Sequence, residues 1–364
     1  MKVVKMNNYN SEFKINDRLI SIDSPTYFIA DIASNHDNDL DRAIDLIHEA
    51  KKAGADAVKF QHFTADTIVS DYGFKNLDSL SHQSSWEKSV YDTYKDAECN
   101  VNWTEELVRA SKRENIEFMT TPYNFDVLTV IDRYVNAYKI GSGDITWIDF
   151  IEEISKLNKP ILLATGASDL EDTKRAVNSV LSYNSNICLM QCNTNYTGSL
   201  ENFKYINLNV LKTFSEIYPN MILGLSDHSP YHSAVLGAIA LGARIIEKHF
   251  TDDNSRVGPD HAFSMNPETW KDMIDRSREL ENALGDGIKR IEENEQETVI
   301  VQRRCIRLKD NLNENDLITK DNIEFLRPAP KDSIEPYKVN EIINKKVNKF
   351  KNKGDALYFN DLMG

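Results

Sequence analysis

The sequence predicts an α/β protein in which a (β/α)8 barrel, or TIM barrel, precedes a small β-rich module. Eight short apolar runs alternate with longer amphipathic stretches, which is the order of a parallel sheet whose strands are joined by helices. These units fill about 250 residues, the usual length of this barrel. Polar residues follow nearly every apolar run, as expected of a site on the C-terminal rim of a barrel. A doubly wound open sheet, the main alternative, would concentrate such residues at one switch point.

The expected strands are rich in β-branched residues and end at polar positions. They lie at 27–33, 56–63, 116–122, 137–143, 160–166, 187–193, 221–228 and 244–250. The stretches between them, such as LDRAIDLIHEAKKAGA and LEDTKRAVNSVLSYN, have the spacing of amphipathic helices. Before the first strand, EFKINDRLIS predicts a β-hairpin that turns at Asn16 and Asp17 and closes the bottom of the barrel.

Changes of pattern along the chain define the expected domains. Residues 1–285 form the barrel with its N-terminal hairpin, 286–298 a charged helical linker, and 299–364 a separate module with short strands and turns. That module is small enough to need support from something larger. Residues 63–102 are rich in Ser, Asp, Lys and Tyr, and we expect a partly helical loop over the barrel mouth that could act as a lid.

Composition restricts the classes of partner. The net charge of −14 argues against a nucleic-acid or anionic-membrane binder. The N-terminus lacks an apolar segment, and no run approaches the ~18 apolar residues of a spanning helix. The four cysteines have no metal-binding or redox spacing. These features predict a reduced, cytoplasmic protein that acts on small molecules.

Two histidines follow neighbouring strands and form the most informative pair. His228 ends ILGLSDH and His249 nearly ends IIEKHF, while Ser226 and Glu247 lie two residues earlier on the same faces. Two imidazoles at adjacent strand ends could form part of a divalent-metal site that also takes water or substrate oxygens. Two hydrogen-bonded core histidines are the alternative.

Two lysines, Lys59 and Lys139, also lie late in their strands. Because lysine is seldom buried alone, they indicate an anionic ligand, a phosphate or a carboxylate, unless each pairs with a structural carboxylate. Ser142 and its flanking glycines would let a phosphate approach the backbone. Asp31 could bind the metal, hold a substrate hydroxyl or accept a proton, or it could cap a helix. Asp260 follows Gly258 and Pro259, which either stiffen the loop so that it presents this carboxylate to a ligand or form an ordinary turn.

Together these motifs resemble the sialic acid synthase family, NeuB-type enzymes that condense phosphoenolpyruvate with an N-acetylated hexose to form a nonulosonic acid and phosphate. The resemblance covers almost the whole chain, through IADIASNH, AGADAVKFQ, YKIGSGD, GLSDHS, EKHFTDD and GPDHAFSMNP. The C-terminal RRC, DNLNENDLIT and FLRP motifs are similar to the SAF, or antifreeze-like, domain. The resemblance implies a barrel followed by that domain.

The resemblance also implies roles for individual residues. His228 and His249 would hold the divalent metal, Mn²⁺ first, with Mg²⁺ or Co²⁺ as alternatives. Arg327 in FLRP would reach the site of a partner subunit, giving a domain-swapped homodimer that binds phosphoenolpyruvate and an N-acyl amino sugar. The catalytic set would add Asp31, Lys59 and Lys139. The substrate-binding set would be Lys59, Gln61, Thr121, Lys139, Ser142, Asp144, Asn193, Tyr196, Ser226, Asp260 and Arg327.

Departures from the family pattern leave the acceptor open. Asp31 and Asp144 stand where glutamate is usual, and Ala164 replaces a hydroxyl residue. These changes favour an altered acceptor pocket, so a diacetamido sugar leading to a legionaminic- or pseudaminic-type acid is an alternative to N-acetylmannosamine. Two other functions remain: a metal-independent lysine aldolase acting through a Schiff base, and a sugar-binding protein without catalysis.

Overall fold

The computed structural model describes residues 8–77, 86 and 88–363. The chain divides into two compact units, the first ending at Gly285 and the second beginning at Asp286. Among the described residues, no helix has the length and apolar character needed to cross a membrane.

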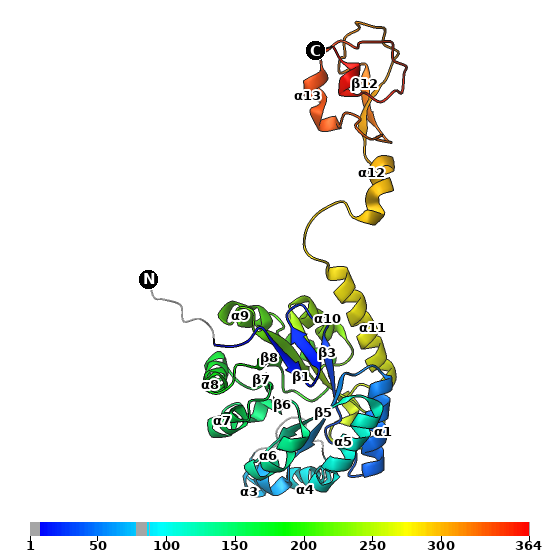
Figure 1. Cartoon of the computed structure of the whole chain (residues 1–364). Coiled ribbons are helices and arrows are strands. Elements are labelled where there is room, and N and C mark those ends of the chain that lie inside the picture. Colours follow the sequence, from blue (N-terminus) through cyan, green and yellow to red (C-terminus); the bar gives the residue numbers. More distant parts are fainter. Residues whose placement is uncertain (1–7, 78–85, 87, 364) are drawn as a thin grey trace, which may run out of the picture. The chain divides into compact units, whose positions relative to one another are not determined.

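The first unit contains an eight-stranded parallel sheet that curves into a barrel (Figure 1). The strand order is β5-β4-β3-β10-β9-β8-β7-β6, so each strand pairs with its neighbours in the chain and β3 pairs with β10. The end strands β5 and β6 also lie side by side. This order confirms the predicted TIM barrel and excludes the open sheet. The strands are β3 Tyr27–Asp31, β4 Ala57–His62, β5 Glu117–Pro122, β6 Tyr138–Ile140, β7 Ile161–Ala164, β8 Ile187–Cys192, β9 Ile222–Asp227 and β10 Ala243–His249.

Helices surround the sheet, which explains why most strand residues are buried on both faces. The longest helix, α11, begins at a capping box in which Asn266 and Thr269 exchange hydrogen bonds. The helices that follow strands are α1 Leu40–Lys52, α5 Thr104–Glu114, α6 Phe125–Ile131, α7 Ile148–Lys156, α8 Leu170–Leu181, α9 Val210–Ile217, α10 Ser233–Ala240 and α11 Pro267–Leu284.

The described part of the expected lid segment contains the short helices α2 Ala65–Ile68, α3 Asp71–Lys75 and α4 Val90–Asp96, as expected of a partly helical loop. Residues 78–85 and 87 of this segment lie outside the described residues. The closure of this segment over the barrel mouth therefore stays a prediction.

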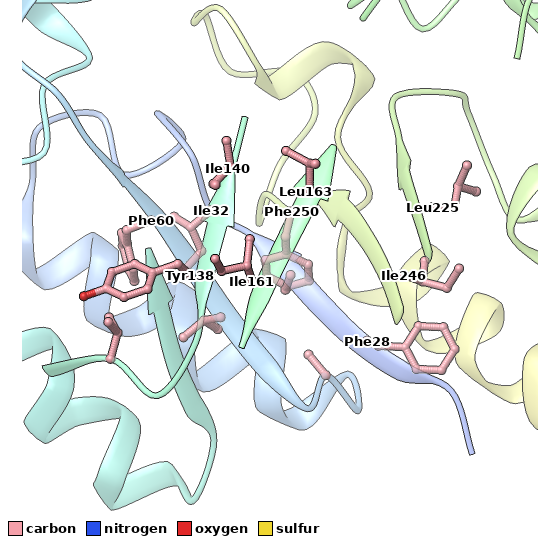
Figure 2. Close-up of a cluster of buried hydrophobic side chains, with 14 of the residues drawn as sticks. Phe28, Ile32, Phe60, Tyr138, Ile140, Ile161, Leu163, Leu225, Ile246 and Phe250 are labelled. Atoms are coloured by element: carbon pink, nitrogen blue, oxygen red, sulfur yellow. The ribbon is translucent and has the colours of Figure 1, made fainter. Parts of the chain in front are cut away.

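Two apolar cores flank the sheet. Figure 2 shows part of the larger one, where side chains such as Phe28, Tyr138 and Ile246 point from the strands toward the surrounding helices. The smaller core fills the barrel between the early strand residues. There the hairpin of β1 Glu12–Ile15 and β2 Arg18–Ser21 contributes Phe13, Ile15 and Ile20. The hairpin thus lies at the end of the barrel opposite the polar strand tips, as expected from the sequence.

The ladder between β9 and β10 contains one irregularity. Ala243 pairs with Leu223, but Ile245 pairs with the next residue, Gly224, so Arg244 is one extra residue in β10. Its guanidinium donates to the carbonyls of Ile22 and Ala243. This β-bulge decides which residues lie opposite each other at the far ends of both strands.

The second unit has its own small core around Ile306, Ile318 and Leu357. Its elements are α12 Gln296–Gln302, β11 Cys305–Leu308, β12 Ile323–Leu326 and α13 Val339–Ile342, with β11 and β12 antiparallel. Residues 286–292, expected to be helical, are irregular, with Gly287 at positive φ. Helix α12 instead runs past the expected boundary at 299, because the apolar residues 299–301 continue the helix rather than start a strand.

Candidate functional site

Four charged side chains meet inside the barrel near the strand ends. The Lys59 Nζ atom lies 2.8 Å from Asp31 Oδ2, and Lys139 Nζ lies 2.9 Å from Glu247 Oε1. The same Glu247 oxygen is 3.8 Å from Lys59 Nζ. All four side chains are buried, with exposed fractions of 5% or less. The two predicted lysines are therefore neighbours, joined through one carboxylate.

This arrangement favours the charged forms of Lys139 and Asp31. Burial lowers the pKa of Lys139, but the Glu247 carboxylate outweighs it, so the pKa lies above its ordinary value. Burial raises the pKa of Asp31, but Lys59 and His249 outweigh it, so that pKa lies below its ordinary value. An ammonium held in this way is a fixed positive charge for an anionic ligand.

Neutral polar residues predicted for the site surround these charges. Thr121 Oγ1 lies 3.4 Å from Lys59 Nζ, and Ser226 Oγ lies 3.5 Å from Lys139 Nζ. The Gln61 amide donates to Asp31 over 3.0 Å. Ser142, in the short helix η4 Ser142–Asp144, accepts a 2.9 Å hydrogen bond from the Gly166 backbone N–H.

The two histidines also meet, with ring centroids 5.3 Å apart. His228 Nδ1 donates to the Asn193 carbonyl over 2.9 Å, so in the neutral ring Nε2 carries the lone pair. Tyr196 packs against His228, with centroids 4.2 Å apart. The buried Nδ1 atom of His249 has no hydrogen-bond partner, and Asp260 Oδ2 lies 3.7 Å from it.

A divalent metal fits these two residues. Neutral imidazole nitrogens are ordinary ligands of such ions, and an unpartnered buried ring nitrogen on His249 is the kind of atom that a metal would satisfy. Within the described part of the chain, no group of three or more His, Cys, Asp or Glu side chains forms a complete metal site. The pair therefore suits an open site whose other ligands are water or substrate.

A cavity of about 370 Å³ opens beside these residues. Among the predicted residues, Gln61, Ser142, Asp144, Tyr196, His249 and Asp260 line it. Burial raises the pKa of Asp144 to about 6, so this carboxyl group exchanges its proton near neutral pH. An outer cavity of about 880 Å³ shares several lining residues with the first, including Ser34, Trp86 and Tyr196.

One predicted residue meets the cluster through its backbone rather than its side chain. The Asn193 side chain donates to the Tyr205 carbonyl within its own loop, and only its backbone carbonyl takes part, by holding His228. Arg327 is exposed on the second unit. Its contact with a barrel stays a prediction.

Sequence reasoning left three close neighbours of the site without a role. Glu247 bridges the lysines, and its position two residues before His249 was the signal that could have identified it. The buried Tyr123 hydroxyl lies 3.5 Å from Gln61. Burial raises the pKa of the Cys192 thiol, but His228, Ser142 and Lys139 outweigh it and lower that pKa; nothing in the spacing of this cysteine indicated such a contact.

Comparison with known proteins gives consistent matches. The profile of the NeuB family matches residues 46–289. The N,N'-diacetyllegionaminic acid synthase of Campylobacter jejuni is 33% identical over 84% of this chain and 91% of its own length. A pseudaminic acid synthase of the same species is 30% identical over 93% and 97%. Among solved structures, the spore coat polysaccharide biosynthesis protein SpsE of Bacillus subtilis has a TM-score of 0.64 and 26% identity over 97% of this chain and 99% of its own.

Proposed function

Because this chain belongs to the NeuB family, we propose that it is a transferase that condenses phosphoenolpyruvate with an N-acylated amino sugar. The products are a nonulosonic acid and inorganic phosphate. The observation that carries this proposal is the meeting of two ammonium groups and two imidazoles beside a cavity at one end of the barrel. Two charged or hydroxylated reactants can be held together there.

In this proposal the two lysines hold phosphoenolpyruvate. Lys59 and Lys139 supply fixed positive charge in a buried setting, where interactions with phosphate and carboxylate oxygens are strong. Thr121 and Ser226 offer hydroxyl groups beside them. Holding the anion in one orientation contributes to catalysis by removing the entropy cost of aligning it with the acceptor.

Members of the NeuB family are typically metal-dependent. In this chain His228 and His249 would hold the divalent ion, with Mn²⁺ the first candidate and Mg²⁺ or Co²⁺ the alternatives. Such an ion supplies Lewis-acid chemistry that makes a sugar aldehyde more electrophilic. The residues around it fix the rings: the Asn193 carbonyl holds His228, and Tyr196 packs against it.

The proposed reaction forms a C–C bond and a C–O bond and breaks the C–O bond to phosphate. C3 of phosphoenolpyruvate attacks C1 of the open-chain sugar, water adds at C2, and the C2–O bond breaks so that phosphate leaves with the bridging oxygen. Asp31 is suited to orient the water rather than to deprotonate it, because Lys59 holds its pKa low. Asp144, with a pKa of about 6, is the better group to take or return the proton.

Isotope labelling tests this route. Oxygen-18 placed at the bridging C2–O position should appear in the released phosphate, as measured by mass spectrometry. Label retained in the sugar acid would contradict the proposed cleavage. A lysine aldolase acting through Lys139 is not supported, since the pKa of Lys139 is raised by Glu247 and a Schiff base needs a neutral amine. Borohydride should accordingly trap no substrate on Lys139.

The outer cavity supports an uncharged acceptor with acylamino groups. Its apolar lining includes Val257, Ala262 and Phe263, which suit the methyl groups of such substituents. Among the described residues that line it, both cations are paired: Arg256 with Asp37 at 2.9 Å, and Lys88 with Asp96. No lining cation in that set is left over for a sugar phosphate.

A panel of acceptors tests the substrate. With phosphoenolpyruvate and Mn²⁺, we expect a neutral 2,4-diacetamido hexose to give the highest kcat/KM for phosphate release, N-acetylmannosamine less, and N-acetylmannosamine 6-phosphate least. Preference for the phosphorylated sugar would contradict the acceptor proposed here. If the protein binds a sugar but releases no phosphate from phosphoenolpyruvate with any acceptor, the non-catalytic alternative would be favoured.

The second unit would contribute a residue to the site of a partner subunit. The FLRP segment of the chain resembles the segment by which the SAF domain of one subunit reaches the site of its partner, and Arg327 is exposed. We therefore include a domain-swapped homodimer, in which Arg327 contacts the acceptor in the partner subunit.

A further inference from the structure

A buried ion pair lies at the ends of β9 and β10, immediately before the two histidines. Lys248 Nζ lies 2.5 Å from Asp227 Oδ2, and each side chain is only 2% exposed. Lys248 precedes His249 in the chain, and Asp227 precedes His228. Because strand side chains alternate, this pair points to the face opposite the imidazoles. It therefore touches neither the cavity nor the proposed substrates.

The pair is tied to the loop that follows β9. Lys248 Nζ also donates to the Ser229 carbonyl over 2.6 Å. The Asp227 carboxylate accepts from the Ser229 backbone N–H at 3.0 Å and from its hydroxyl at 2.8 Å. The Lys248 ammonium, the Asp227 carboxylate and Ser229 thus hold the backbone on both sides of His228 against β10.

The ladder makes this pair the last link before the histidines. Lys248 and Asp227 are cross-strand partners, one step beyond the pair formed by Glu247 and Ser226. The bulge at Arg244 sets this register. In a regular ladder that continued from Ala243 and Leu223, Arg244 would pair with Gly224. Lys248 would then lie opposite His228, and the two imidazoles would not lie opposite each other.

The position of the His249 ring depends on its strand backbone more than the position of the His228 ring does. The His228 ring is held by the Asn193 carbonyl, whereas His249 Nδ1 has no hydrogen-bond partner. The His249 ring is placed by packing against Phe263, with centroids 5.0 Å apart, and by its strand. The distance between the two rings is therefore set largely by how β10 is fixed to β9.

We propose that Asp227 and Lys248 are positioning residues that hold the two imidazoles at the spacing a divalent cation needs. This inference rests on the metal site of the proposed function. A buried pair of this kind often adds little stability compared with apolar side chains of similar volume, whereas it can fix one geometry. Its expected contribution is thus to metal affinity rather than to folding.

The experiment measures Mn²⁺ binding to the full chain by isothermal titration calorimetry, and thermal unfolding by circular dichroism. The main variant carries Asp227→Leu with Lys248→Met, which replaces the charges with apolar groups. We expect it to remain folded and to bind Mn²⁺ about tenfold more weakly, as is common when groups that support metal ligands are removed. A matched control, Asp361→Leu with Lys351→Met, replaces a buried pair of the second unit and should leave Mn²⁺ affinity unchanged.

The outcomes separate this inference from the metal site itself. A folded main variant that binds Mn²⁺ with the wild-type dissociation constant would overturn the positioning role. If that variant does not fold, Asp227→Asn decides: at least threefold weaker binding is expected, and wild-type binding would overturn the role. His228→Ala should lose Mn²⁺ binding; if it does not, the proposed metal site fails, whatever the ion pair does.

Discussion

Among single residues, Asp144 gives the clearest dependence on pH. Burial raises the pKa of this carboxyl group from 3.8 to about 6. Between these values the native protein keeps a proton that the unfolded chain has lost, so the free energy of unfolding falls as the pH rises from about 4 to 6. Above pH 6 the native state contains a half-buried carboxylate with little compensation.

Asp144→Asn should remove this slope. We expect the variant to be more stable than the wild type by roughly 1–2 kcal/mol at pH 8, where the wild-type carboxylate is charged, and to lose most of its turnover. Urea unfolding at several pH values between 4 and 8 measures the first effect, and phosphate release the second. The exposed Asp45→Asn in α1 is the control. Equal pH slopes in wild type and variant would refute the role of burial at Asp144.

Residues of the candidate site could be predicted from the sequence where their position in a strand determines their location. Lys59, Lys139, His228 and His249 could be found because strand ends of a barrel meet at one rim. The partners that neutralise the lysines could not be assigned, since pairing depends on distances between strands that are remote in the chain. The hydrogen bond of the Asn193 side chain within its own loop was not predictable either, because such local bonds leave no pattern in the sequence.

At the scale of elements, the bulge in β10 depends on a glycine in the neighbouring strand. A Cβ atom added at Gly224 would lie 2.7 Å from the Ile245 carbonyl oxygen and 2.9 Å from Met190 Cγ. The first of these is backbone and cannot rotate away. The close approach of β9 and β10 at the bulge therefore requires the absence of a side chain at this position.

Gly224→Ala should force the two strands apart. We expect a loss of about 2 kcal/mol in the free energy of unfolding, typical of overpacking, and weaker Mn²⁺ binding because the histidines no longer lie opposite each other. Gly143→Ala serves as the stability control, since nothing lies within 4 Å of its added Cβ atom. Urea unfolding compares the two variants. Equal stabilities would show that the strands adapt to the added methyl group.

The eight strands lay close to their predicted limits, because each is a short apolar run between polar stretches. The bulge at Arg244 was not predictable, since it reflects a fit between β9 and β10 rather than any local pattern. The irregular residues 286–292 differ from the expected helix because charged composition alone does not stabilise one beside Gly285 and Gly287.

For the whole molecule, the decisive question is whether one chain completes the site of another. Arg327→Ala and His228→Ala should each abolish phosphate release when alone. Coexpressed in equal amounts, they should restore about one quarter of the wild-type activity. Random pairing gives half heterodimers, and one of the two sites in each would combine an intact barrel with an intact Arg327. Phosphate assays on the purified mixture of all dimers measure this.

If the coexpressed variants recover no phosphate release, a swapped arrangement is contradicted. Arg327 would then act in the site of its own chain, or in no site. Coexpression of His228→Ala with His249→Ala is the control, because both lesions lie in the barrel and no pairing can repair them.

The pairing of each lysine with an acid has a consequence for how the affinities of the anion and the metal depend on each other. Lys59 and Lys139 carry two positive charges that Asp31 and Glu247 already balance, in a chain that is itself strongly acidic. A multiply charged anion entering this neutral setting needs a counter-charge from elsewhere, and a divalent cation beside it supplies one. By thermodynamic linkage, each ligand should then raise the affinity of the other by the same factor.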